Sequence, residues 1–311
     1  MILCVTLNPC LDKTLTTPPW KAGDNIRGTA LREVVGGKGN NVARALTRLG
    51  RAARPVTFLG GPVGDRCEAL LREADGFDPL VVRTGAATRE ILTVRAEGLE
   101  PTAFFDPDPA ITRGEAEALV LAIHRAFQAE AIEALTLSGS SPSEATHGLY
   151  SDLIALARSR DVPVFLDTYG PALEAIWGFW PDAIQLNRRE AGLLLREPDP
   201  DESDLARLLE RWARRGVRTA VVTDGPNPAL ARVAGHLYRA KPPAIDPVNP
   251  IGSGDCHLAG LVDATLAGLE PQALLRRSIA AAVANALVWD AGGIDEEEVR
   301  RIEGFVEVER A

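Results

Sequence analysis

The residues of this chain that could do chemistry gather first in a glycine-rich segment, Gly36-Gly37-Lys38-Gly39-Asn40-Asn41, directly before the amphipathic run VARALTRLG. Glycines before a helix let backbone amides approach a ligand, and the helix N-terminus favours an anion. The segment is not a Walker A motif, because no Ser or Thr follows Lys38. A glycine turn with a capping asparagine explains the pattern equally well. Only four lysines occur in the chain, however, and this scarcity favours a site around Lys38.

A second glycine-rich turn, Asn249-Pro250-Ile251-Gly252-Ser253-Gly254-Asp255, opens a long apolar run, CHLAGLVDATLAG. The amides of Gly252, Ser253 and Gly254 at a helix start are unpaired. They can hold phosphate oxygens or the charge that develops on a transferred phosphoryl group. Asp255 stands where a carboxylate could accept a proton from an attacking hydroxyl. It could also be a cap that favours the helix dipole, and the spacing alone favours that cap.

Both turns need a scaffold, and the rest of the chain predicts an α/β fold. Strand-length apolar runs alternate with helical periodicities, which is typical of a largely parallel sheet flanked by helices. The expected core strands are Ile2–Leu7, Pro55–Leu59, Ala134–Ser138, Pro163–Asp167, Ala183–Asn187 and Ala220–Thr223. The expected helices are Asn41–Leu49, Ser143–Arg158, Arg188–Leu195, Leu205–Arg215, Asp255–Ala267 and Pro271–Trp289.

Two segments break this alternation. From about Leu11 to Val35 and from about Thr88 to Phe105, polar and apolar residues alternate with period two. Such strands suit a half-exposed antiparallel sheet. Two excursions from one parallel core could pair into a small accessory sheet, which would be a lid or an interface.

Composition narrows the function classes. The chain has 311 residues, 46% of them hydrophobic, with a formal net charge of −9 and a pI near 5.1. This acidic balance argues against a general nucleic-acid-binding surface. We read no signal peptide, and no apolar stretch approaches the roughly 20 residues that span a bilayer. The four cysteines have no CxxC spacing and favour free thiols in a reducing cytosol, so we expect a cytoplasmic protein.

The two glycine-rich segments together resemble the signatures of the ribokinase/PfkB family of carbohydrate kinases. The first signature reads GGKGNNVARALTRLG here and the second reads NPIGSGDCHLAGL. The opening TLNPCLD is similar to that of the 1-phosphofructokinase and tagatose-6-phosphate kinase subgroup, and further similarities are SGSSP, NRRE, VVTDG, AKPP and ANAL. The resemblance implies a Rossmann-type core that binds ATP, formed by residues 1–11, 36–87 and 106–311. It also implies a β-sheet lid, residues 12–35 and 88–105, which closes over the sugar and often forms a homodimer contact.

The resemblance also implies roles for single residues. Asp255 would be the general base, and the turn of Gly252, Ser253 and Gly254 would be the anion hole. The implied substrate contacts are Asp12, Gly37, Lys38, Asn41, Arg89, Ser138 and Ser140. Among them, a lysine point charge and an arginine fork would hold the phosphate already on the sugar. The implied nucleotide contacts are Asn187, Thr223, Asp224, Gly225 and Asn285, with Glu190 acting on Mg²⁺ through water.

Plainer roles stay open for several of these residues. Asp12 could lie in a surface turn, Arg89 could be an exposed strand charge, and the serines could form an ST-turn. Asn187 could simply cap a helix, which the sequence alone favours.

Four departures from the family pattern also keep other functions open. Gln185 stands where a lysine is common, prolines stiffen the loop 224–228, and Pro250 replaces a common threonine. The lid-end stretch 105–109 carries Asp106 and Asp108, whose carboxylates could repel an anionic substrate.

Three functions follow from these observations. The leading expectation is an ATP-dependent kinase that converts a phosphorylated ketohexose, namely fructose 1-phosphate, tagatose 6-phosphate or fructose 6-phosphate, to the bisphosphate. The alternatives are a kinase for an unphosphorylated sugar or nucleoside and a weakly catalytic sugar-phosphate-binding protein.

Overall fold

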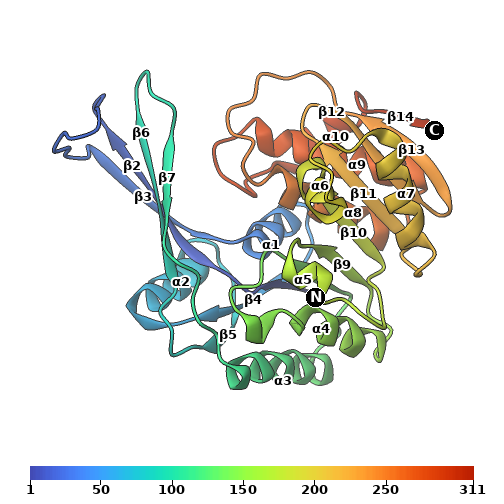
Figure 1. Ribbon diagram of the computed structural model, residues 1–311, viewed down its shortest axis with the longest axis horizontal. Helices are drawn as coiled ribbons and strands as arrows, with labels where there is room; N and C mark the ends of the chain where they lie inside the picture. Colours follow the sequence, from blue (N-terminus) through green and yellow to red (C-terminus); the bar gives the residue numbers. More distant parts are fainter.

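The computed structural model describes residues 1–311 and is built around a ten-stranded sheet (Figure 1). Its strand order is β14-β13-β12-β11-β10-β9-β8-β1-β4-β5. The parallel strands are β1 (Ile2–Thr6), β4 (Ala53–Leu59), β5 (Leu80–Arg83), β8 (Ala134–Ser138), β9 (Val164–Asp167), β10 (Ala183–Asn187) and β11 (Thr219–Asp224). An antiparallel edge is formed by β12 (Asn227–Val233), β13 (His236–Lys241) and β14 (Glu307–Arg310).

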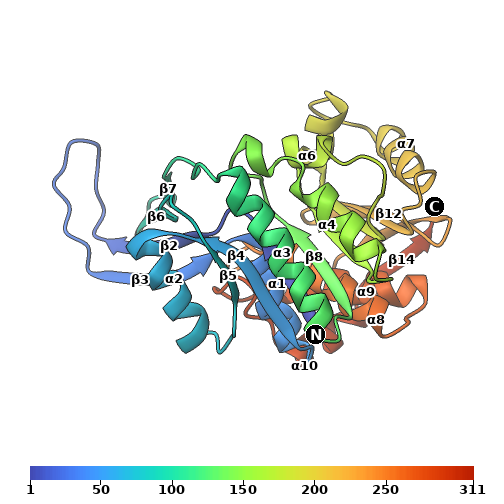
Figure 2. The same cartoon turned by 90° about the horizontal axis from the view of Figure 1, so that it is seen from below.

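Helices cover both faces of this sheet, and a buried apolar cluster lies on each face (Figure 2). One cluster contains residues of α1 (Lys38–Arg48), α2 (Gly61–Glu73), α8 (Ser253–Leu266), α9 (Pro271–Ala286) and α10 (Glu296–Glu303). The other contains residues of α3 (Arg113–Ala129), α4 (Leu149–Arg158), α5 (Pro171–Glu174), α6 (Arg188–Leu195) and α7 (Glu202–Ala213). Because both faces are covered, the central strands are almost continuously apolar, as β1 and β8 show.

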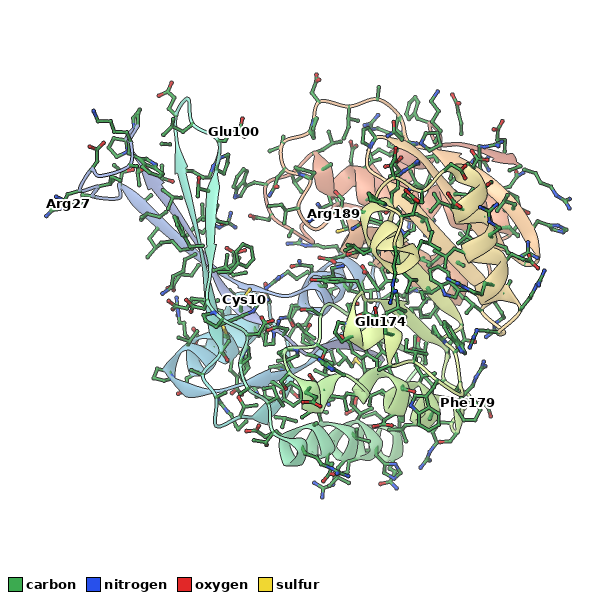
Figure 3. The ribbon with its side chains drawn as sticks, viewed as in Figure 1. Cys10, Arg27, Glu100, Glu174, Phe179 and Arg189 are labelled. Atoms are coloured by element: carbon green, nitrogen blue, oxygen red, sulfur yellow. The ribbon has the colours of Figure 1, made fainter.

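A second, four-stranded sheet projects from the core, in the order β3 (Ala30–Gly36), β2 (Cys10–Thr17), β6 (Arg89–Ala96) and β7 (Thr102–Phe105). Cys10 lies at its base, and Arg27 and Glu100 lie near its outer ends (Figure 3). The outer pairs are antiparallel as expected, but the central pair β2·β6 is parallel. Both central strands follow parallel strands of the large sheet, β1 and β5, so they leave the core in the same direction.

The α/β prediction is confirmed, and the differences lie at particular elements. The predicted strands Ala134–Ser138 and Ala183–Asn187 have the observed bounds, and so has the predicted helix Arg188–Leu195. The predicted helix Ser143–Arg158 is divided into a 3₁₀ turn (Glu144–Thr146) and α4. The structure adds elements that we did not predict: α2, α3, α5, α10, β5, β12, β13 and β14.

Two further observations concern the whole chain. No helix combines the length and the apolar character needed to cross a bilayer. All four cysteines are free and buried, as their spacing predicted.

Candidate active site

The parallel strands bring polar side chains to one edge of the large sheet. Asn8 follows β1, Ser140 follows β8, Asp167 ends β9 and Asn187 ends β10. In open α/β sheets the carboxyl edge of the strands is where ligands bind. The helices α1 and α8 also begin at this edge. Lys38 in the first turn of α1 bonds to Asp167 of β9, and Gly254 in the first turn of α8 bonds to Gln185 of β10.

A cavity of about 1170 Å³ lies between this edge and the second sheet. The predicted residues that line it are Asp12, Gly37, Lys38, Asn41, Arg89, Ser140, Asn187, Glu190, Gly252, Gly254 and Asp255. On the far side, the Arg95 guanidinium lies 3.8 Å from the centre of the Trp289 ring, and Arg32 pairs with Asp290. These two contacts join the second sheet to the segment after α9, across the cavity.

The first glycine-rich segment is a helix start rather than a loop. The helix α1 begins at Lys38 and not at the predicted Asn41, so Lys38 lies in its first turn. Gly37 caps the helix with a φ of 114°, which favours glycine. A Cβ atom on Gly39 would lie 2.5 Å from the Val5 carbonyl oxygen, so only glycine lets α1 approach β1 this closely.

The Lys38 ammonium is held between carboxylates. Its Nζ donates to Asp167 Oδ1 at 2.8 Å and to Glu190 Oε1 at 3.2 Å, and it lies 5.5 Å from the centre of the Tyr169 ring. Burial lowers the pKa of Lys38, but attraction by Asp167, Glu190 and Asp255 outweighs burial and raises the pKa overall. The lysine is therefore charged and already shared by carboxylates. The sequence analysis missed Asp167, although it ends a predicted strand, where binding side chains gather.

Asp255 lies in the first turn of α8 and is 5% exposed. Asn41 Nδ2 donates a hydrogen bond of 2.7 Å to its Oδ2 atom. Burial raises the pKa of Asp255 to about 7; Lys38 and the Asn41 bond oppose this shift, and Asp167 and Glu190 add to it. A carboxylate with such a pKa can accept a proton near neutral pH, as a general base must.

The turn before Asp255 leaves the amides of Gly252 and Gly254 free, whereas the Ser253 amide donates to the Pro250 carbonyl oxygen at 3.2 Å. Gly252 has a φ of 87° and caps α8 without a side-chain bond. Asn285 holds this turn, because its Nδ2 donates to Ile251 O at 2.8 Å and to Ser253 Oγ at 3.2 Å. Its Oδ1 accepts from the Gly292 amide at 2.9 Å. The side chain is fully buried and bonded within the protein, so it positions the turn. Its predicted contact with the adenine stays a prediction.

Other predicted residues also lie outside the residues that line this cavity. Ser138 is fully buried at the end of β8, and its hydroxyl has no partner in the protein. Asp224 accepts a 3.4 Å hydrogen bond from Arg188 and faces a separate, smaller cavity. The cavity lining does not include Ser253, Thr223 or Gly225 either. Asn187 caps α6 through Glu190, so its predicted cap is confirmed; it also lines the main cavity, where its contact with the nucleotide stays a prediction.

Arg89 forms the cationic side of the cavity near the second sheet. Its Nη2 donates to the Asn8 carbonyl oxygen at 3.3 Å, and its Nη1 lies 3.2 Å from Asp108 Oδ1. Asn8 Nδ2 donates to the same Asp108 oxygen at 2.8 Å and to Ser140 Oγ at 3.2 Å. The side chains of Arg89, Asn8 and Ser140 therefore converge. Asn8 and Asp108 were not predicted as site residues. The signals were the position of Asn8 at the end of a strand and the carboxylate of Asp108 in the lid-end stretch.

One departure from the family pattern, Gln185, lies in a buried contact with the second glycine-rich turn. Gln185, where a lysine is common, donates through Nε2 to the Gly254 carbonyl oxygen at 2.7 Å. Its Oε1 lies 2.5 Å from Nδ1 of His257, whose pKa burial lowers to about 4. The neutral imidazole and the amide thus support the base of the glycine turn without adding a positive charge.

The donor set tests whether Mg²⁺ fits this site. No group of three or more His, Cys, Asp or Glu side chains could hold a metal ion by itself. Both Glu190 oxygens have protein partners, since Oε2 accepts from the Asn187 amide at 3.0 Å and Oε1 accepts from Lys38. Magnesium commonly keeps several waters and binds substrate phosphates with few carboxylates. The residues fit Mg²⁺ in that form only, with Glu190 and Asn187 acting through water.

Comparison with solved structures defines the class of fold. Phosphofructokinase-2 from Escherichia coli, solved in its tetrameric inhibited form, matches with a TM-score of 0.87 and 24% identity over 98% of both chains. A possible 1-phosphofructokinase from Thermotoga maritima matches with a TM-score of 0.84 and 23% identity over 100% of this chain and 99% of its own. Arabidopsis thaliana ribokinase, complexed with ribose and ATP, matches at 0.74 and 18% over 97% and 98%. The fold is therefore ribokinase-like.

The family follows from the sequence itself. The model of the pfkB family of carbohydrate kinases matches residues 5–297. The chain belongs to the pfkB family, and its class of enzyme is a carbohydrate kinase.

Proposed function

We propose that this protein transfers the γ-phosphoryl group of ATP to a hydroxyl of a phosphorylated ketohexose and releases the bisphosphate and ADP. The observation that carries the proposal is a single cavity lined by both the buried base Asp255 and the cationic group Arg89. The acceptor hydroxyl would lie at Asp255, and the phosphate already on the sugar would lie at Arg89. Fructose 1-phosphate, tagatose 6-phosphate and fructose 6-phosphate are the candidate substrates.

The proposed reaction uses the geometry of the α8 start. The acceptor oxygen attacks the γ-phosphorus atom, the bond from that phosphorus to the ADP oxygen breaks, and the hydroxyl proton passes to Asp255. The turn of Gly252, Ser253 and Gly254 would stabilise the charge that develops on the phosphoryl group, chiefly through the free amides of Gly252 and Gly254. Bound Mg²⁺ would supply further neutralisation of phosphate charge. Catalysis of this kind depends mostly on positioning and electrostatics.

The sugar would lie between the core and the second sheet. Asp12 lines the cavity, and its carboxylate could accept hydrogen bonds from sugar hydroxyls. Burial raises the pKa of Asp12. Gly37 and Asn41 also line the cavity. Arg89 would form a bidentate pair with the sugar phosphate, supported by Ser140. That Lys38 binds the same phosphate stays a prediction, as do the contacts of Ser138 with the substrate and of Thr223, Asp224 and Gly225 with the nucleotide.

We propose the domain organisation that the sequence suggested. Residues 12–35 and 88–105 form a lid, and residues 1–11, 36–87 and 106–311 form the core. The lid carries Leu31 and Phe104, each 56% exposed, on its β3 and β7 strands. Apolar side chains exposed in this way favour an interface with a second copy. We therefore propose a homodimer through the lid, which sedimentation would test; a monomer at micromolar concentration would contradict it.

An ADP-release assay with six acceptors tests the substrate class. We expect activity with at least one of fructose 1-phosphate, tagatose 6-phosphate and fructose 6-phosphate, and kcat/KM values lower by about 10²-fold or more with fructose, ribose and adenosine. This ratio follows from the loss of a charge-assisted bidentate contact, worth about 3 kcal/mol. Activity on the neutral acceptors alone would replace the proposal with a sugar or nucleoside kinase, which the carboxylates of the 105–109 stretch favour.

Binding of a sugar phosphate without turnover would favour the third function, a sugar-phosphate-binding protein. The specific observations behind it are Gln185, which brings no charge to the nucleotide phosphates, and Pro226 and Pro228, which remove amide donors. Calorimetry with the same acceptors, in the presence of a non-hydrolysable ATP analogue, distinguishes this outcome from an unfolded or inactive preparation.

The pKa of Asp255 predicts the pH dependence of the reaction. Its carboxyl must lose a proton to act as a base, so kcat/KM should rise with pH through about 7 and level off above it. The charged groups around it are Lys38, Asp167 and Glu190, and Lys38 keeps the midpoint from lying higher. The check is a pH–rate profile measured at saturating ATP. A midpoint near the ordinary value of 3.8 would contradict the prediction.

A further inference from the structure

The Arg89 guanidinium already holds an anion that belongs to the protein. Asp108 Oδ1 lies 3.2 Å from Arg89 Nη1 and accepts a 2.8 Å hydrogen bond from Asn8 Nδ2. The same Asn8 amide reaches Ser140 Oγ at 3.2 Å. A carboxylate oxygen therefore occupies the donors that a phosphate oxygen would use at this corner of the cavity.

The two partners of this ion pair differ in their freedom to leave it. The Arg89 side chain is 16% exposed, and the Asp108 side chain is 46% exposed. Arg89 is also held by its bond to the Asn8 carbonyl oxygen, and its buried Nε has no partner in the protein. Asp108 can therefore move into water while the guanidinium stays in place, with one of its donors still unused.

The neighbouring carboxylate, Asp106, bonds to the backbone of β6 and not to Arg89. Its Oδ2 accepts a 2.9 Å hydrogen bond from the Glu90 amide, and its own amide donates to the Glu90 carbonyl oxygen at 3.0 Å. Asp106 thus closes the start of β6 and does not touch Arg89. Of the two acidic residues in the 105–109 stretch, Asp108 alone is paired with Arg89.

We propose that Asp108 is a specificity-determining residue, an internal carboxylate that occupies the anion site of Arg89 and leaves when a sugar phosphate binds. The inference rests on the proposed function, because it assumes that Arg89 holds the substrate's phosphate. A half-exposed ion pair of this kind is weak, whereas a phosphate can pair with the guanidinium through two oxygens. The Asp108 carboxylate therefore selects ligands by their charge. A dianionic phosphate displaces it from Arg89 readily, and a singly charged or neutral group does not.

The test compares Asp108→Asn with Asp106→Asn, which removes the same charge two residues away. We expect Asp108→Asn to lower both the KM for the sugar phosphate and the Kd for inorganic phosphate, measured by calorimetry, by about three- to tenfold. Asp108→Asn should lower KM and leave kcat unchanged. Asp106→Asn should change neither constant by more than about twofold, the size of ordinary surface effects.

The same substitution in an Arg89→Gln variant shows whether the gain in phosphate affinity depends on Arg89. In Arg89→Gln, the further change Asp108→Asn should no longer strengthen phosphate binding. An unchanged or weaker affinity in Asp108→Asn, or an equal gain in the Arg89→Gln background, would overturn the proposal. Thermal unfolding of each variant identifies any loss of fold.

The two proposals can fail separately. If the wild type phosphorylates only neutral sugars, the proposed function fails. The titration with inorganic phosphate still decides whether Asp108 competes for the anion site, because it requires no turnover.

Discussion

Replacing Asp255 with asparagine is expected to lower kcat by about 10²–10⁴-fold, the range that a positioned general base contributes. Asparagine has nearly the same shape and can keep a contact with Asn41, so the α8 start should persist. It cannot accept the hydroxyl proton, however. The KM for ATP and the unfolding temperature should change little, since the amides of the 252–254 turn belong to the backbone.

A matched control comes from Asp152, which is exposed on α4, a helix that contributes no residue to the lining of the cavity. Asp152→Asn removes the same formal charge and should keep full activity. The pH–rate profile adds a second criterion, because the residual rate of Asp255→Asn should lose the rise near pH 7. Turnover within about tenfold of the wild type would remove Asp255 from the role of base.

Replacing Lys38 with methionine should affect both stability and catalysis. The change leaves Asp167, which is 3% exposed, and Glu190, which is 12% exposed, without their shared cation. Breaking a buried ion pair costs about 3–5 kcal/mol, and we expect the lower end because the Lys38 side chain is 29% exposed. Denaturant unfolding at pH 7 measures this loss.

The catalytic effect of Lys38→Met follows from the same charges. Lys38 lowers the pKa of Asp255, so its removal should move the midpoint of the pH–rate profile upward. At pH 7 a larger fraction of the base would then be protonated, so kcat/KM at that pH should fall. A midpoint raised by about one pH unit would lower it about fivefold, because the deprotonated fraction at pH 7 would fall from about one half to about one eleventh. If Lys38 also binds the sugar phosphate, the KM for that substrate should rise as well.

Lys241→Met is the control, because Lys241 is 60% exposed and forms only a surface pair with Glu307. It should leave stability and the pH–rate profile unchanged. A Lys38→Met variant with wild-type stability and an unshifted profile would show that the carboxylates around Lys38 are neutralised in some other way.

Several elements could be predicted from local sequence because they depend on local pattern. The strand ALTLS is buried along its whole length, which fits a strand covered on both faces. The helix α3 was missed although Thr112 and Glu115 form a capping box that the sequence displays. The edge strands β12 and β13 were missed for a different reason: their pairing is antiparallel and depends on neighbours rather than on periodicity.

The sequence by itself determined the two glycine-rich helix starts, the acidic residue after the second and the family to which they point. These features are local, because a helix start and its free amides are encoded within a few residues. Even so, the sequence placed Lys38 before the helix, whereas the structure places it in the first turn of α1. Nothing in the local sequence showed that Asn285 would hold the second turn through Ile251.

Only the tertiary structure decided which charges meet. Lys38 and Asp167 are 129 positions apart, and Asn41 and Asp255 are 214 apart, yet each pair lies within hydrogen-bond distance. The carboxyl edge of the parallel sheet brings these residues together, since every strand ends there with its own side chain. The pKa of Asp255 and the pairing of Arg89 with Asp108 depend on that assembly. Burial and through-space charge have no signature in the local sequence.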